Sequence, residues 1–548
     1  MRLLLAPIFA FALIGTTTPE TRFSVTLARD DTGHAGGRLL LFAEAATAEN
    51  ATFDAVDIRG PGDRIAVAAR DITDFGPDRR VTIDTEESAF STGFTTLPAG
   101  PYRVQVVLDR NRDYAYGGRG PGDLVSKVVT VRFPLTSVPS IALEDAVSPA
   151  AAQFDTAGLP PRAAEQITAS RAHLHEEQIT SNALTRFRGT EQKIRAWILT
   201  PPGYDSKARV TYPTVYTAGG FGTTHKLDGQ QLSRIWHLME AGAIPPMIWV
   251  AVDYATATGT TEFADSVNNG PWGLALVTEV IPTLEARYRM DAKPSGRFLT
   301  GHSSGGWFAL WTMVRYPAFF GGSWATSPDP VDFHDFLGVD LYAPDANMYR
   351  DSRGAPRPLE RDHGKILATI EQAAKLEAIL GRDGGQFRSF DCAFSPRGAD
   401  GSAAFLFDRQ SGAIEPTVAA YWRENYDISR RIETNWGQLK PYLEGKVHVT
   451  TGAADSFYLE RSVRRLEGTF RKVGARAEFT YVPNASHGVS EVYARGEDRS
   501  ALWKEIASAM YAVARPGRAA AKDSQPRGHN NRNQLEDRRI TPARTRVT

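Results

Sequence analysis

The sequence contains a single cysteine, Cys392, among 548 residues. One thiol cannot form an intrachain disulfide or a cysteine-based metal site, so packing must stabilise the fold. Lys plus Arg and Asp plus Glu each number 63, which leaves a formal net charge of zero. A neutral chain has no electrostatic reason to bind nucleic acid or an anionic membrane. We therefore expect a small or neutral partner, no nucleic acid and no metal.

The apolar run at the N-terminus is short. It covers residues 3–14 and follows Arg2, whereas a membrane-spanning helix needs about 20 apolar residues. A positive charge followed by a short apolar run is typical of a secretory signal peptide. We predict a signal peptide over residues 1–21 and export to the periplasm or the medium, with no membrane span. The cleavage site stays open.

Residues 22–133 alternate polar and apolar side chains, as in RVTIDTE (80–86) and YRVQVVLD (102–109), between clusters of Gly, Pro and Asp. Short strands at this spacing predict a small all-β sandwich domain. No pair of nucleophile and base is visible in it, so we expect it to be non-catalytic. The Pro- and Ala-rich residues 134–165 predict a linker.

From residue 166 to 515, apolar strands alternate with helical patterns. TVYTAG (214–219), PMIWVAVDY (246–254) and RFLTG (297–301) are such strands. This alternation favours an α/β domain with a mainly parallel sheet that helices cover on both faces. Residues 335–430 lack a strong strand pattern and predict a lid or insertion. The polar, basic tail 516–548 predicts disorder.

The stretch GHSSGGW (301–307) follows an expected strand and opens an expected helix. In this context Gly-x-Ser-x-Gly predicts a sharp strand-to-helix turn that exposes a nucleophilic serine, Ser303. The flanking glycines allow a strained turn and a close helix. The Ser304 N–H at the helix N-terminus is placed to bind an oxyanion.

A serine nucleophile needs a histidine base and an acid, which follow it in the chain in this fold. His487 lies in a loop after the strand-like segment AEFTYV, where a base is expected. Asp455 follows the strand-like segment KVHVTTG and is our preferred acid. Asp329 and Asp332, which follow an earlier strand, are the alternatives.

The turn after the strand YPTVYTA should supply the second oxyanion donor. Gly219 and Gly220 would let the backbone approach the substrate, which makes the Phe221 N–H the candidate. Gly220, Trp272 and Trp324 are candidates for a substrate pocket, with buried core aromatics as the equal alternative for the two tryptophans.

These stretches together resemble the esterase family of the α/β-hydrolase fold that includes enterochelin esterase, S-formylglutathione hydrolase, feruloyl esterase modules and mycolyltransferases. The resemblance covers roughly residues 180–514 and rests on YPTVYTAGGFG, RFLTGHSSGGWFALW, VHVTTGAADSFYLE and VPNASHG. It implies a triad of Ser303, Asp455 and His487, backbone donors at Ser304 and Phe221, and no cofactor. The family often has a histidine before the oxyanion glycine, where this chain has Gly219.

The sequence therefore predicts a β-sandwich domain that is followed in the chain by an α/β-hydrolase domain. The predicted activity is that of an exported serine esterase that works through an acyl-enzyme. Its substrate would be a small-molecule or polymer-linked ester, and neither its identity nor the oligomeric state can be read from the chain. An acyltransferase of the same fold is one alternative. A non-catalytic glycan-binding protein is another.

Overall fold

The computed structural model describes residues 20–27, 36–47, 65–76, 78–148, 160–491, 493, 498–517 and 543–547. The chain forms two compact units. The first comprises Met1–Ala55, Asp63–Arg110 and Asp123–Ala146, and the second comprises Val56–Gly62, Asn111–Gly122 and Val147–Thr548. The predicted signal peptide lies outside the described residues up to position 19.

The first unit is an all-β unit with one nine-stranded sheet among its described residues. Its strands are β1 (Arg22–Leu27), β2 (Gly37–Ala45), β3 (Ile65–Ile72), β4 (Arg80–Asp84), β5 (Ala89–Phe90), β6 (Gly100–Asp109), β7 (Leu124–Ser126), β8 (Val129–Phe133) and β9 (Ser140–Ala146). The sheet runs in the order β4-β1-β9-β7-β6-β2-β3-β5, with β8 also paired to β6. Because β3 also contacts β4, the sheet curls around one apolar core.

Both ends of this unit differ from the predicted boundaries. The expected linker 134–165 contains β9, which pairs with β1 and β7 and buries Ile141 and Leu143. At the other end, the Thr21 carbonyl accepts hydrogen bonds from the backbone and side chain of Thr85. The strand SIALEDA alternates polar and apolar residues, but prolines precede and follow it. Because proline is typical of loops, this stretch was predicted as a linker.

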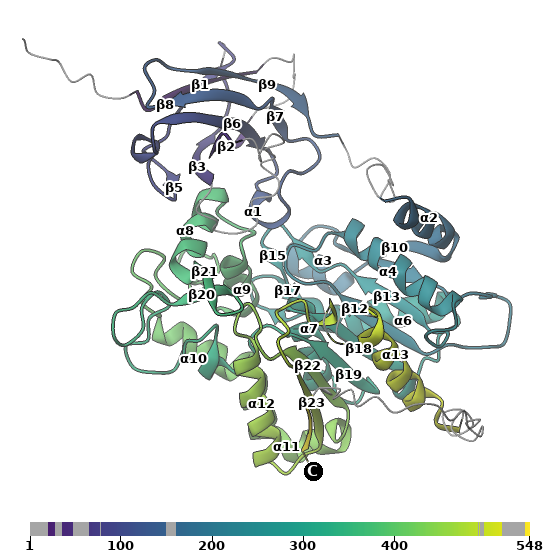
Figure 1. Cartoon of the computed structure of the whole chain (residues 1–548). Coiled ribbons are helices and arrows are strands. Elements are labelled where there is room, and N and C mark those ends of the chain that lie inside the picture. The colour runs from purple at the N-terminus through teal and green to yellow at the C-terminus, as the bar shows by residue number, and fades with distance from the viewer. Residues whose placement is uncertain are drawn as a thin grey trace, which may run out of the picture. The chain divides into compact units, whose positions relative to one another are not determined.

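The second unit is built around a nine-stranded sheet (Figure 1). In spatial order the strands are β10 (Leu174–Thr180), β11 (Lys193–Leu199), β13 (Ile248–Val252), β12 (Thr214–Ala218), β18 (Arg297–His302), β19 (Gly322–Thr326), β22 (Val447–Gly452), β23 (Ala477–Val482) and β24 (Ala543–Val547). Neighbours from β13 to β23 are parallel, and the outer pairs are antiparallel. The parallel strands therefore direct their carboxyl ends to one edge.

Helices cover both faces of this sheet, as expected for parallel strands. One apolar core joins the sheet to α5 (Trp272–Ala275), α6 (Ile281–Arg287), α7 (Ser304–Arg315), α11 (Ile428–Leu443) and α12 (Glu460–Lys472). A second core joins it to α4 (His225–Glu240) and α13 (Ala501–Ala514). The strand order and the two helical layers are those of the α/β-hydrolase fold, as predicted.

β24 lies within the tail that was predicted to be disordered. It pairs antiparallel with β23, from Ala477 opposite Val547 to Tyr481 opposite Ala543. A strand that joins a sheet edge does so through its backbone N–H and C=O groups, so it needs no apolar composition. The rest of the tail, residues 518–542 and 548, lies outside the described residues.

The predicted lid or insertion is a folded segment between β19 and β22. Its elements are η6 (Phe333–Asp335), the hairpin of β20 (Pro358–Asp362) and β21 (Lys365–Thr369), α8 (Ile370–Leu380), α9 (Gln386–Phe394) and α10 (Pro416–Asn425). Phe390, Phe394 and Trp422 are buried in the same core as α7. The insertion is thus packed into the body of the unit.

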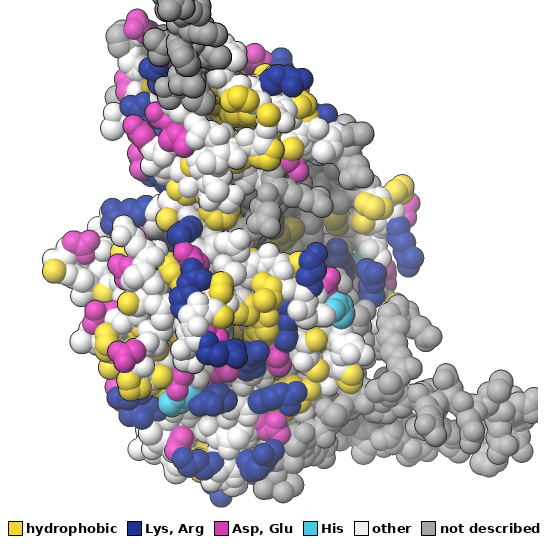
Figure 2. Space-filling model, turned by 60° about the vertical axis from the view of Figure 1, so that its left-hand side comes forward, with side chains coloured by type: hydrophobic (Ala, Val, Ile, Leu, Met, Phe, Trp, Pro, Cys, Tyr) yellow, Lys and Arg dark blue, Asp and Glu magenta, His cyan; other side chains and the backbone are white. Residues whose placement is uncertain are grey.

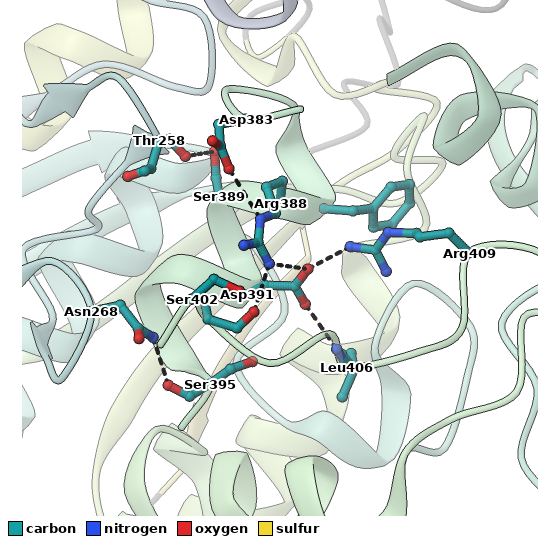
Figure 3. A network of polar contacts seen from close by, with 12 residues as sticks. Thr258, Asn268, Asp383, Arg388, Ser389, Asp391, Ser395, Ser402, Leu406 and Arg409 are labelled. Carbon is teal, nitrogen blue, oxygen red and sulfur yellow. Dashed lines mark hydrogen bonds and ion pairs between the residues drawn. The ribbon is translucent and has the colours of Figure 1, made fainter. Parts of the chain in front are cut away.

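A buried ionic network holds the insertion in place (Figure 3). The carboxylate of Asp391 accepts hydrogen bonds from the Arg409 guanidinium at 2.6 Å and the Leu406 N–H at 2.9 Å, and it also pairs with Arg388. Such a buried acid is tolerated because its oxygens are satisfied. Cys392, the next residue in α9, is 4% exposed, and burial raises its pKa to about 11.

The surface of the second unit carries mixed side chains. Figure 2 shows apolar side chains beside Lys and Arg on the face it presents. In the insertion, the guanidinium groups of Arg388 and Arg409 lie 4.5 Å and 5.0 Å from the ring of the exposed Phe405. Across the residues that the structure describes, no helix combines the length and the apolarity that crossing a membrane requires.

Candidate active site

Ser303 stands alone between the end of β18 at His302 and the start of α7 at Ser304. Its φ of 58° and ψ of −122° place a non-glycine residue in a strained conformation, which is typical of functional turns. A Cβ at Gly305 would overlap the carbonyl oxygen of Ala218 in β12. The glycine therefore lets α7 pass close to the sheet, and the turn presents Ser303 at the carboxyl edge.

Asp455 and His487 follow neighbouring parallel strands, β22 and β23, and meet at the same edge. The Nδ1 atom of His487 lies 3.0 Å from Oδ2 of Asp455. Asp455 is fully buried. Burial opposes its charge most strongly, but the hydrogen bond and charge of His487 and further hydrogen bonds outweigh burial, so the pKa of Asp455 lies below its usual value. An ionised acid thus orients the imidazole.

The imidazole of His487 lies beside the nucleophile turn. Its ring centroid is 4.5 Å from that of His302, the residue before Ser303, and 5.0 Å from that of Phe457. Burial, followed by the charge of His487, lowers the pKa of His302 to about 3. His302 is therefore neutral at physiological pH and packs against His487 without carrying a charge.

The two alternative acids have different surroundings. The Ser303 hydroxyl donates a hydrogen bond to Oδ1 of Asp329 at 3.3 Å, and none of the hydrogen bonds within the described ranges joins it to His487. Asp332 lies at the start of η6, where its carboxylate accepts from the His334 N–H at 3.0 Å and from Arg465 at 3.3 Å. The structure thus places Asp329, but not Asp332, in contact with Ser303.

The loop after β12 lies against the same turn. A Cβ at Gly220 would lie 3.2 Å from Cβ of Ser303, so the backbone at Gly220 lies close to that residue. The ring of the next residue, Phe221, packs edge-on against Tyr116 at 5.2 Å, and the Tyr116 hydroxyl donates to the Thr223 carbonyl at 3.1 Å. No sequence pattern indicates a role for Tyr116, because it belongs to the segment Asn111–Gly122 far upstream.

Both tryptophans of the predicted pocket are buried. Trp272 is buried, and its indole donates to the Asn269 carbonyl at 3.1 Å. Trp324 points to the face of the sheet opposite α7, where its ring stacks on His448 at 4.4 Å and lines a cavity of about 420 Å³ under α13. Successive side chains of a strand lie on opposite faces of the sheet. The sequence of one strand therefore does not indicate which of the two faces lies at the site.

Two further residues touch this machinery and were missed. Glu262 is almost fully buried, and burial followed by the charge of Asp329 raises its pKa well above the usual range. Arg361 in β20 donates from Nε to the Asp455 carbonyl at 2.9 Å and pairs with Glu460 at 2.8 Å. Both lie outside any motif, so only their burial and contacts identify them.

The chain is similar to known esterases in sequence pattern and in structure. A family model described as “Putative esterase” matches residues 188–505. A ferulic acid esterase structure is 17% identical, with 62% of this chain and 98% of that chain covered and a TM-score of 0.35. A CE1 ferulic acid esterase from Anaeromyces mucronatus is 14% identical, with coverages of 62% and 89% and a TM-score of 0.32. An S-formylglutathione hydrolase from Agrobacterium tumefaciens is 14% identical, with coverages of 62% and 94% and a TM-score of 0.34. No curated protein matches the chain.

Proposed function

Since the chain belongs to the family described as “Putative esterase” and is a carboxylic ester hydrolase, we propose that it forms an acyl-enzyme on Ser303. The contact between His487 and Asp455 at 3.0 Å supports this proposal most directly. That pair packs against His302, next to a serine in a strained turn. A nucleophile, a base and an acid that orients the base are the parts that acyl transfer to serine requires.

In the proposed reaction the Ser303 hydroxyl leaves Asp329 and turns to Nε2 of His487. The imidazole takes the hydroxyl proton while Oγ attacks the ester carbonyl carbon. Collapse of the tetrahedral intermediate breaks the bond to the alcohol, which leaves with the proton from His487. A water molecule then gives a proton to His487 and attacks the acyl-enzyme, and the acid departs as Oγ regains its proton.

Two backbone N–H groups would stabilise the oxyanion that forms in each half of this reaction. Ser304 is the first residue of α7, where N–H groups have no partner within the helix. The Phe221 N–H follows Gly220, which lies against Ser303. Both donors were predicted from the sequence, and both belong to the proposal.

The substrate of the proposed esterase is a small-molecule or polymer-linked ester. We also propose that the protein is exported, which N-terminal sequencing of protein from cells would test: a chain that keeps residues 1–14 would contradict it.

A fluorophosphonate probe tests the acyl-enzyme proposal. We expect it to label the wild-type protein and not Ser303→Ala, and we expect the variant to lose hydrolysis of p-nitrophenyl acetate. Labelling or full activity in Ser303→Ala would overturn the proposal.

Product analysis with an added acceptor alcohol separates hydrolysis from acyl transfer, because a transferase would give mainly the new ester.

A further inference from the structure

The second serine of GHSSGG binds a buried carboxyl group. Asp329 is 3% exposed and accepts a hydrogen bond from the Ser304 hydroxyl at 2.6 Å through Oδ2, while Oδ1 accepts from Ser303 at 3.3 Å. The Asp329 N–H also donates to the Ser303 carbonyl at 3.1 Å. Three hydrogen bonds thus join Asp329 to the nucleophile turn.

The hydrogen bond from Ser304 favours the ionised form of Asp329. A hydroxyl bond of 2.5–2.7 Å is typical of a charged acceptor, and the bond from Ser304 falls in that range. The bond from Ser303 is longer and therefore weaker, so Ser303 can exchange it for His487. Asp329 anchors Ser304 firmly and Ser303 only loosely.

Neighbouring groups decide where the protons reside. Asp329 interacts electrostatically with Glu262 and Tyr254 in the chain after β13, and with Asp455 and His487 in the loops after β22 and β23. Burial, opposed by the Ser304 hydrogen bond, raises the pKa of Asp329 to about 6. Glu262 is buried with Oε2 unpartnered among the described residues. Two adjacent buried carboxyl groups do not ionise together readily, so Glu262 keeps its proton.

We propose that Asp329 is a positioning residue for the reaction: its carboxylate anchors the Ser303–Ser304 turn and adds a second negative charge facing His487 when that imidazole becomes positive. This inference rests on the proposed function, since it assigns Asp329 a part in proton transfer from Ser303. Asp455 orients the imidazole of His487 directly. Asp329 acts on that imidazole through the electrostatic field of its carboxylate and through the position of the Ser303–Ser304 turn. The turn needs Ser304 because its hydroxyl donates the hydrogen bond that anchors the turn to Asp329.

The pH profile of p-nitrophenyl acetate hydrolysis by the full chain tests this role. A nearby carboxylate favours a protonated imidazole. Asp329→Asn should therefore move the acid limb of kcat/KM to lower pH by about half a unit or more and lower the plateau by about 10- to 100-fold. Ser304→Ala removes the anchor and the hydrogen bond that favours the ionised form of Asp329, so its plateau should fall and its acid limb should move no further than that of Asp329→Asn.

Asp332→Asn is the matched control, because Asp332 is also buried but binds Arg465 and η6. It should keep the wild-type profile. An unchanged acid limb in Asp329→Asn, or the same shift in Asp332→Asn, would overturn the inference. The position of the limb does not depend on how much of a variant folds. Full activity in Ser303→Ala would instead overturn the proposed function, so the two failures can be told apart.

Discussion

The Nδ1 atom of His487 lies 3.0 Å from Oδ2 of Asp455, although 32 residues separate the two in the chain. Parallel strands β22 and β23 bring them together, because each residue follows the carboxyl end of its strand. Asp455 is fully buried with a lowered pKa, and His487 is partly exposed.

Asp455→Asn should lower kcat by about 10⁴-fold, since an amide holds the wrong imidazole tautomer and cannot stabilise its charge. Steady-state kinetics with p-nitrophenyl acetate measure this, and circular dichroism checks that the variant folds. Asp332→Asn serves as the control and should retain activity. Near-normal kcat in Asp455→Asn would show that another group orients His487.

Asp329 should weaken the fold at neutral pH. Its pKa is raised from 3.8 to about 6 by burial, so the folded state holds the proton more tightly than the unfolded state. Stability is therefore lost as pH rises from about 4 to about 7, by up to about 3 kcal/mol for two pKa units.

Asp329→Asn should remove this pH dependence. Urea unfolding at pH 4.5 and pH 7.5 would show the variant gaining stability relative to the wild type at the higher pH, even as activity falls. A difference between variant and wild type that does not change with pH would contradict burial as the cause.

Tyr116 should influence catalysis through the loop that carries Phe221. Tyr116→Ala removes both the ring contact and the hydrogen bond to the Thr223 carbonyl, and displacement of an oxyanion donor should lower kcat by about 10- to 100-fold. Tyr116→Phe keeps the ring and loses only the hydrogen bond, so it should cost about 1 kcal/mol of stability and retain most activity. Equal kcat in the two variants would exclude a role for the ring.

The close approach at Gly305 should be intolerant of any side chain. Gly305→Ala would place a methyl group on the Ala218 carbonyl oxygen, so we expect an insoluble or unfolded protein. Gly468 lies within α12 with nothing near its missing Cβ. Gly468→Ala should raise stability by about 0.5–1 kcal/mol. Thermal unfolding compares the two, and a folded, active Gly305→Ala would contradict the packing argument.

Periodicity and motif together predicted the fold of the second unit. The buried strands around TVYTA and RFLTG and the glycines of GHSSGGW leave few alternatives for the parallel sheet and the turn at Ser303. The order Ser303, Asp455, His487 along the chain also led to the pair Asp455 and His487, which lie 3.0 Å apart in the structure. Local sequence was sufficient here because parallel strands place their following loops at one edge.

Other parts could not be predicted, because they depend on tertiary contacts. Glu262 stands in a polar stretch whose burial no periodicity signals, and Tyr116 reaches Phe221 from more than 100 residues upstream. Trp324 was a candidate for the pocket because of its residue type. Its position in β19 directs the side chain to the face of the sheet opposite α7. The hairpin of β20 and β21 was missed because its side chains are mostly partly exposed or exposed and do not alternate.

The lone thiol of Cys392 can serve as a chemical probe of the motion of α9. It is buried on α9 next to Asp391, and burial raises its pKa, which disfavours the reactive thiolate. A maleimide or dithiobisnitrobenzoate added to the native protein can therefore react only when α9 moves away from its neighbours. Because no other cysteine competes, the labelling rate reports how often the insertion opens, and it can be followed without altering a single residue.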